Sequence, residues 1–130
     1  MNVLEHTDSF LNLFNIALKK SKKYVLVALP NEDNIISRFR FLFGKGILTH
    51  GLDMINKKPG HKHQWLIQYN PALKLLKKNS KKYKFDLLST LLFIQYPKSF
   101  IKRQIYKFLM LFVPKKIQMQ CFCLVFNKNI

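Results

Sequence analysis

The spacing of apolar residues along the chain predicts an alternation of strands and helices. Val3 and Leu4 are typical of the end of a buried strand. Residues 7–23 begin with cap residues, repeat apolar side chains every three or four positions and end in lysines, which predicts a helix. Residues 24–29 form a short β-branched apolar run, typical of a strand buried on both faces. Together these segments predict a βαβ unit with two parallel strands.

Residues 44–69 interrupt this alternation. They show no clear periodicity, and they hold all four glycines, three of the four histidines and the only tryptophan. A predicted helix over residues 33–43 precedes them and stops at Gly44. A long irregular insert of this kind usually carries function.

The C-terminal part resumes the regular pattern. Asn70-Pro71 favours a helix start, residues 85–94 predict a strand, Ser99 is placed to cap a helix, and residues 117–127 predict a last strand. The helix after Ser99 could lay its apolar face on an anionic membrane, but burial of that face on the sheet is favoured. The helical residues expected in the core are Ile35, Ile36, Phe39, Leu42, Phe43, Ile101, Ile105, Phe108, Leu109 and Phe112.

The order of these elements predicts an α/β fold in a single domain over residues 1–130. A chain of 130 residues that is 48% hydrophobic has enough apolar material for a core. The expected sheet has about four strands, with the strand that ends at Leu4 lying beside the strand over residues 24–29 and parallel to it. That first strand is expected to present an exposed edge.

The charge is strongly positive and unevenly distributed. The formal net charge is +17, and residues 54–130 hold 16 basic and 1 acidic side chains against 7 basic and 5 acidic before them. Such a field attracts nucleic acid, anionic lipid or an acidic partner. The only arginines, however, are Arg38, Arg40 and Arg103. Because base and phosphate recognition relies on arginine forks, nucleic acid is not favoured as the main partner, and a lysine-rich coding bias explains much of the charge.

Cysteine use and the N-terminal segment favour a reducing cytoplasm. Cys121 and Cys123 lie two residues apart in a predicted strand, where they do not bridge easily. The N-terminus has neither the basic nor the apolar region of a signal peptide, and no apolar run reaches the roughly 18 residues of a transmembrane helix. The net charge is compatible with a loose association with a membrane surface.

Candidate site residues follow two predicted strands. In open α/β sheets, ligands bind outside the carboxyl ends of parallel strands. Glu5-His6 follows the first strand and Pro30-Asn31 follows the second, so both pairs are expected at the same sheet edge. The alternative is that these residues only cap the following helix and turn the chain.

Other possible chemical sites are weaker. His61 and His63 with Cys121 and Cys123 offer four zinc-type ligands, but the cysteine spacing within an apolar strand is unlike that of zinc sites. No metal is therefore expected. His50 belongs to no recognisable catalytic set, and there is no Ser-His-Asp arrangement, phosphate-binding loop or carboxylate dyad.

Three segments together resemble a known family. Residues 3–6 read V-L-E-H, residues 25–31 read V-L-V-A-L-P-N, and residues 60–65 read G-H-K-H-Q-W before a predicted helix. In this order they resemble class I S-adenosylmethionine-dependent methyltransferases of the type found in bacterial surface-sugar gene sets. The resemblance covers nearly the whole chain, and the first two segments are its most specific part.

The resemblance implies a partial Rossmann-like sheet whose last strand is antiparallel. It also implies that this chain corresponds to the C-terminal half of the family domain, because the Gly-rich turn that approaches the cofactor would precede residue 3. The expected function is therefore that of a truncated methyltransferase family member with an incomplete S-adenosylmethionine site. A separate N-terminal half could complete the sheet in trans. The alternative is a catalytically inactive basic module that binds nucleic acid or an anionic membrane surface.

The resemblance further implies roles for individual residues. The cofactor would lie along Asn2, Val3 and Leu4, although Asn2 stands where the family commonly has an acidic residue. Glu5 and His6 would act at the mouth where the acceptor approaches, as a base if the acceptor must lose a proton. The acceptor is expected to be a small molecule, such as a sugar or lipid-linked sugar. The residues expected to contact it are Pro30, Asn31, His63 and Trp65.

Overall fold

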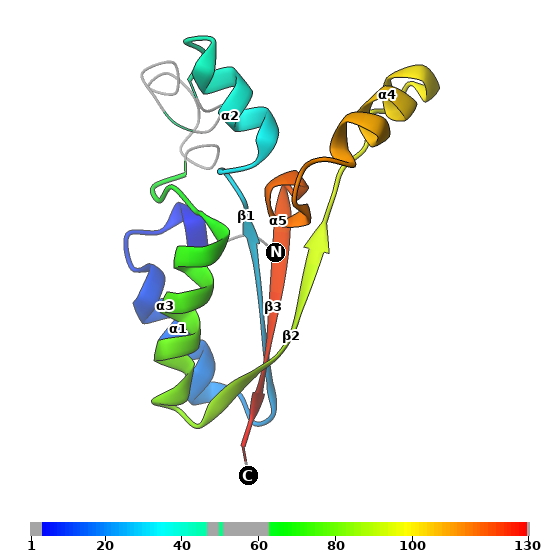
Figure 1. The fold of residues 1–130 in the computed structure, drawn as a ribbon. Helices are drawn as coiled ribbons and strands as arrows, with labels where there is room; N and C mark the ends of the chain where they lie inside the picture. The colour runs from blue at the N-terminus through cyan, green and yellow to red at the C-terminus, as the bar shows by residue number, and fades with distance from the viewer. Residues whose placement is uncertain (1–3, 47–49, 51–62, 130) are drawn as a thin grey trace.

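An antiparallel sheet of three strands forms the centre of the fold (Figure 1). The computed structural model describes residues 4–46, 50 and 63–129. Within them, strands β1 (Tyr24–Pro30), β2 (Phe85–Phe93) and β3 (Cys121–Lys128) lie in the order β1-β3-β2. Both β1 and β2 pair antiparallel with β3, so β1 and β2 run parallel to each other. The last strand of the described chain is therefore the central one.

The helices pack on one face of this sheet or extend from one end of it. Helices α1 and α3 lie side by side against the sheet, whereas α2 and α4 project from the end where β1 and β2 finish (Figure 1). With the sheet they make an α/β fold, as predicted. The helical elements of the described residues are the 3-10 turn η1 (Leu4–His6), α1 (Phe10–Lys20), α2 (Ile35–Leu42), α3 (Tyr69–Lys81), α4 (Phe100–Met110) and α5 (Lys115–Gln118).

The core lies between the sheet and the pair α1 and α3. Alternate side chains of β1 and β3 point into it, and the rings of Phe14 and Phe126 meet there with centroids 5.5 Å apart. This packing follows from the helical spacing of the apolar residues of α1 and α3 and the period-two spacing of the strands. The central core residues are Phe14, Leu18, Leu29, Leu76, Phe85, Phe122, Leu124 and Phe126.

Strand β1 is buried on one face only, which corrects the prediction of burial on both. Its burial alternates along the strand, and Leu26 is 66% exposed. The reason is that α1 and α3 cover a single face of the sheet (Figure 1). On the opposite face, Leu91 and Phe93 of β2 are exposed as well.

The predicted first strand is not present in the described residues. Leu4 belongs to the 3-10 turn η1, and Val3 lies outside the described residues. The described sheet therefore has three strands rather than about four, and β1 pairs there with β3 alone. A cavity of about 160 Å³, lined by residues of η1, α1 and β1 that include Leu4, Leu13 and Leu26, lies beside β1.

The predicted burial of α2 and α4 is wrong. Both helices form close to their predicted bounds, but neither has a buried residue. They extend beyond the sheet instead of packing on it (Figure 1), so their apolar side chains find no core to enter. The predicted core residues that are exposed are Ile36, Phe39, Leu42, Phe43, Ile101, Ile105, Phe108, Leu109 and Phe112.

Several other predictions are confirmed or adjusted. The helix before β1, the helix near Asn70 and the strand over residues 85–94 are confirmed. Of the described residues of the predicted insert, 44–46, 50 and 63–69, Tyr69 begins α3 and the others lie outside helices and strands. The last strand begins at Cys121 instead of Ile117, because α5 occupies the preceding residues. No helix in the described part of the chain is long and apolar enough to cross a membrane.

Candidate functional site

A cluster of two carboxylates and three imidazoles lies at the carboxyl end of β1. Its residues come from three separate segments: η1, the turn after β1, and the insert. Parallel strands β1 and β2 both end on this side, which is where α/β sheets bind ligands. The cluster consists of Glu5, His6, Glu32, His50 and His63.

Glu32 connects the turn after β1 to the insert. Its Oε1 lies 2.6 Å from His63 Nδ1, and its Oε2 lies 2.9 Å from His50 Nε2. The backbone N–H of Ile67 donates to Oε2 at 2.9 Å, and the Glu32 N–H donates to the Ile67 carbonyl at 2.9 Å. Because a buried carboxylate is stable only with such partners, these contacts fix the position of both rings.

Glu5 is a second buried carboxylate in the cluster, and its side chain is fully buried. Neither of its carboxylate oxygens has a hydrogen bond among the described residues, and His6 Nε2 is 3.8 Å from Oε1. The rings of His6 and His63 meet edge to face with centroids 4.8 Å apart. Burial raises the pKa of the Cys121 thiol, and the charge of Glu5 raises it further. The Glu5 carboxylate therefore influences Cys121 at the start of β3 electrostatically, in addition to lying beside His6.

Asn31 anchors the turn after β1 to the segment before β3. Its Nδ2 donates to the carbonyls of Lys116 and Met119, both at 3.1 Å, and its backbone N–H donates to the Gln120 carbonyl at 2.6 Å. Its Oδ1 is buried without a hydrogen bond in the described residues. The preceding Pro30 is paired with Cys121 at the end of the sheet. The N–H groups of Asn31 thus hold the turn against the segment before β3, and its buried Oδ1 could still accept a hydrogen bond.

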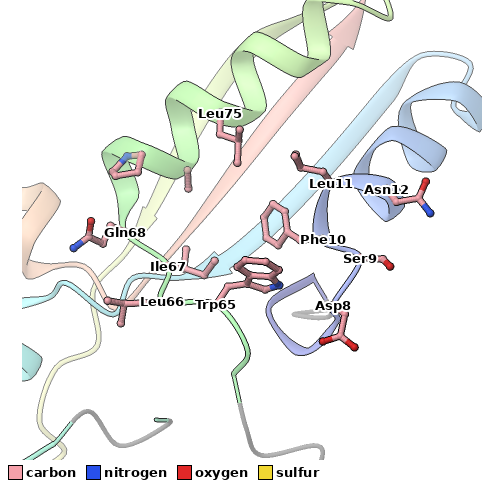
Figure 2. A pocket seen from close by; sticks show the side chains of 12 residues that line it. Asp8, Ser9, Phe10, Leu11, Asn12, Trp65, Leu66, Ile67, Gln68 and Leu75 are labelled. Atoms are coloured by element: carbon pink, nitrogen blue, oxygen red, sulfur yellow. The ribbon is translucent and has the colours of Figure 1, made fainter. Parts of the chain in front are cut away.

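Trp65, two residues after His63 in the sequence, lines an apolar cavity (Figure 2). The indole Nε1–H donates to the Thr7 carbonyl at 2.7 Å, which holds the ring against the start of α1. Figure 2 shows the ring close to Phe10, with Leu75 of α3 on the far side of the cavity. The volume is about 480 Å³, within the usual range for small-molecule sites. Apolar side chains dominate the lining, so the cavity suits an apolar or ring-shaped group.

The cluster also has the composition of a metal site. Glu5, His6 and His63 form one set of possible ligands, and Glu32, His50 and His63 form another, with ligand atoms within 4.8 Å of one another in each. Imidazole nitrogen and carboxylate oxygen are common ligands of zinc and of other divalent transition metals. The sequence-based expectation of no metal stays a prediction. Of the alternative zinc set, His61 lies outside the described residues.

The structure brings together part of the predicted site. Glu5, His6 and His63 lie in one cluster, and Asn31 adjoins it through Glu32. Leu4 packs against the core. The other two residues predicted to contact the cofactor, Asn2 and Val3, lie outside the described residues.

Sequence reasoning missed Glu32 and His50. Glu32 directly follows the predicted Pro30-Asn31 pair at the end of β1, so its position at the sheet edge was a usable signal. His50 carries no comparable signal, because its contact with Glu32 joins residues 18 positions apart, with helix α2 between them. Comparison with known protein families and with curated proteins finds no match to this chain.

Proposed function

We propose that this chain is the acceptor-binding half of an S-adenosylmethionine-dependent methyltransferase. The observation that carries the proposal is the sheet order: the last strand, β3, runs antiparallel between the parallel strands β1 and β2. An antiparallel last strand is what the resemblance to class I methyltransferases implies. The position of the Glu5 and His63 cluster at the carboxyl end of β1 supports the same proposal.

The cofactor half would join at the free edge of β1. In the described residues no strand pairs with that edge, and an apolar cavity lies beside β1 there. The face of the sheet opposite α1 and α3 exposes Leu26 and Leu91. A strand added beside β1, with helices over this face, would bury both features and complete a doubly wound sheet.

The described residues alone do not fit the cofactor. S-adenosylmethionine would supply the methyl group, and its binding in such folds needs a Gly-rich turn directly after a strand. Gly44 and Gly46 follow helix α2 instead, and Leu4 is packed on the core. In this proposal, residues of a second half hold the cofactor.

This chain would prepare the acceptor. Contact with Glu32 holds Nδ1 of His63, which leaves the other ring nitrogen to accept a proton from an acceptor hydroxyl. Glu32 stabilises the imidazolium that results, because its carboxylate is already aligned with the ring. The cavity beside Trp65 would hold the apolar part of the acceptor. A sugar or lipid-linked sugar has both the hydroxyl and the apolar surface that this arrangement suits.

Calorimetric titration with S-adenosylmethionine tests the proposal. The isolated chain is expected to give no saturable heat, and stoichiometric binding would contradict the assignment of the chain as a half. A fusion that places the cofactor-binding half of a class I methyltransferase before residue 4 is expected to bind. In that fusion, Leu26→Lys should weaken binding because it puts a charge at the joint, whereas Ile16→Lys, at an exposed position of α1, should not. A folded fusion without binding would refute the proposal.

A further inference from the structure

Helix α4 turns its apolar face away from the protein. Its least exposed side chains are Arg103, Tyr106 and Met110, which share one face at helical spacing. The opposite face presents Ile105 and Phe108 to solvent. A helix that only stabilised the sheet would be oriented the other way, because burial of apolar area is the main stabilising force in folding.

Helix α2 shows the same exposure at the same end of the molecule. Phe41 and Leu42 are 73% and 74% exposed. An apolar hollow of about 400 Å³, lined partly by Phe39 and Leu109, lies between α2 and α4. The two helices leave the sheet on the same side (Figure 1). We call the exposed apolar residues of these two helices and of the turn after α4 the apolar tip, which comprises Phe39, Phe41, Leu42, Ile105, Phe108 and Phe112.

The charges around the apolar tip are positive. No acidic residue follows Asp86 in the sequence. Just before α2, the carboxylate of Asp33 is paired with Arg38 at 2.8 Å, which leaves Arg40 as a cation of that helix with no acidic partner among the described residues. The cations on and beside α4 and α5 are Lys98, Lys102, Arg103, Lys107, Lys115 and Lys116.

We propose that the apolar tip inserts into the interface of an anionic lipid bilayer. Exposed aromatic and aliphatic side chains enter the boundary between headgroups and acyl chains, while lysines beside them bind anionic headgroups. A nucleic acid would use the cations but would leave the aliphatic face in water. A second copy would bring two chains of net charge +17 together. The bilayer alone satisfies both the apolar face and the charge, and this inference does not depend on methyl transfer.

Vesicle flotation of the full chain tests the apolar contribution. Binding is expected on vesicles of phosphatidylcholine with 30% phosphatidylglycerol, and much less on phosphatidylcholine alone. The double variant Phe108→Ser and Phe112→Ser should lower the partition coefficient by about tenfold or more, because two aromatic rings no longer leave water. The matched control is Leu88→Ser with Leu91→Ser, which removes two exposed apolar side chains from β2, and it should bind as the parent does.

A second pair of variants tests the contribution of charge. Lys102→Gln with Lys107→Gln should weaken binding to the anionic vesicles by roughly 25-fold, since each lysine near such a surface contributes about a factor of five. The control Lys74→Gln with Lys78→Gln changes exposed lysines of α3, away from the tip, and should have little effect. Equal losses from both pairs would show a nonspecific response to net charge and would overturn the proposal.

The depth of insertion gives an independent readout. A Phe108→Trp variant should show a blue-shifted emission on anionic vesicles and quenching by lipids brominated in the acyl chain, relative to the parent with its single Trp65. Absence of quenching would overturn the proposal. So would a dimer in sedimentation velocity that disappears in the Phe108 and Phe112 variant while vesicle binding is unchanged, because that result would assign the tip to a second copy.

Discussion

Glu32 is the residue on which three segments of the chain converge. It follows β1, it holds His63 and His50 of the insert, and it binds the backbone of Ile67. The adjacent carboxylate, Asp33, faces solvent and pairs with Arg38 alone. Glu32 therefore holds several segments of the fold in place, whereas the neighbouring Asp33 makes a single exposed ion pair.

Replacement of Glu32 is expected to destabilise the protein. Glu32→Ala leaves the buried N–H of Ile67 without its acceptor and frees both imidazoles, so the free energy of unfolding should fall by about 2–4 kcal/mol. Asp33→Ala removes an exposed pair and should cost at most about 1 kcal/mol. Urea denaturation of the parent protein and of the two variants measures these free energies. A smaller effect at Glu32 than at Asp33 would contradict the role given to Glu32.

The thiol of Cys121 reports on the Glu5 carboxylate. Burial and the Glu5 charge both raise the pKa of Cys121, so less thiolate is present at any given pH and alkylation should be slow. Glu5→Gln removes the smaller of the two causes and should shift the alkylation rate profile to lower pH. The rate of iodoacetamide modification, followed by mass spectrometry between pH 7 and 10, measures the shift. Asp86→Asn, at the other end of β2, should leave the profile unchanged.

At the scale of elements, β3 carries the fold because both other strands pair with it. Phe126→Ala opens a cavity against Phe14 on the covered face and is expected to cost about 3–5 kcal/mol. Leu26→Ala, on the uncovered face, should cost less than about 1 kcal/mol. Thermal and urea unfolding distinguish the two values. Similar costs for both variants would mean that the two faces of the sheet are equally buried.

The positions of the helices and strands were predicted from the sequence more accurately than their packing. The apolar periods of α1, β1 and β2 encode local structure, and those elements lie close to their predicted bounds. The spacing of apolar residues does not show whether another element covers them. The exposed apolar faces of α2 and α4 were therefore predicted to be buried in the core. For the same reason β1 was predicted to be buried on both faces.

The candidate site was predictable where it follows a strand. Glu5, His6 and Asn31 were found from the rule that ligands bind at the carboxyl ends of strands, and His63 came from the family resemblance. His50 could not be found in this way, because its position depends on the path of the irregular insert. Contacts across such a segment are set by tertiary packing rather than by local pattern.

At the scale of the whole molecule, the candidate site and the apolar tip lie at one end of the sheet. The cluster around Glu32 lies at the carboxyl end of β1, and helices α2 and α4, which carry most of the apolar tip, leave the sheet from the same end (Figure 1). The lysines of α3 lie alongside the sheet instead. The two proposals are compatible in space, since a bilayer that accepts the tip would approach the same end of the sheet as the acceptor of the methyl group.

The central position of β3 has a consequence for how the protein is made. Pro30 and Phe93 both pair with Cys121 at the start of β3, so no two strands of the described sheet can join until β3 is being synthesised. On the ribosome, β1 and β2 must wait with unpaired backbone and exposed apolar side chains. Contacts this distant in sequence form slowly, and waiting strands are prone to aggregate. A nascent chain that stalls before residue 121 would lack every strand pair of the described sheet, which makes the synthesis of β3 the step that commits this sheet to folding.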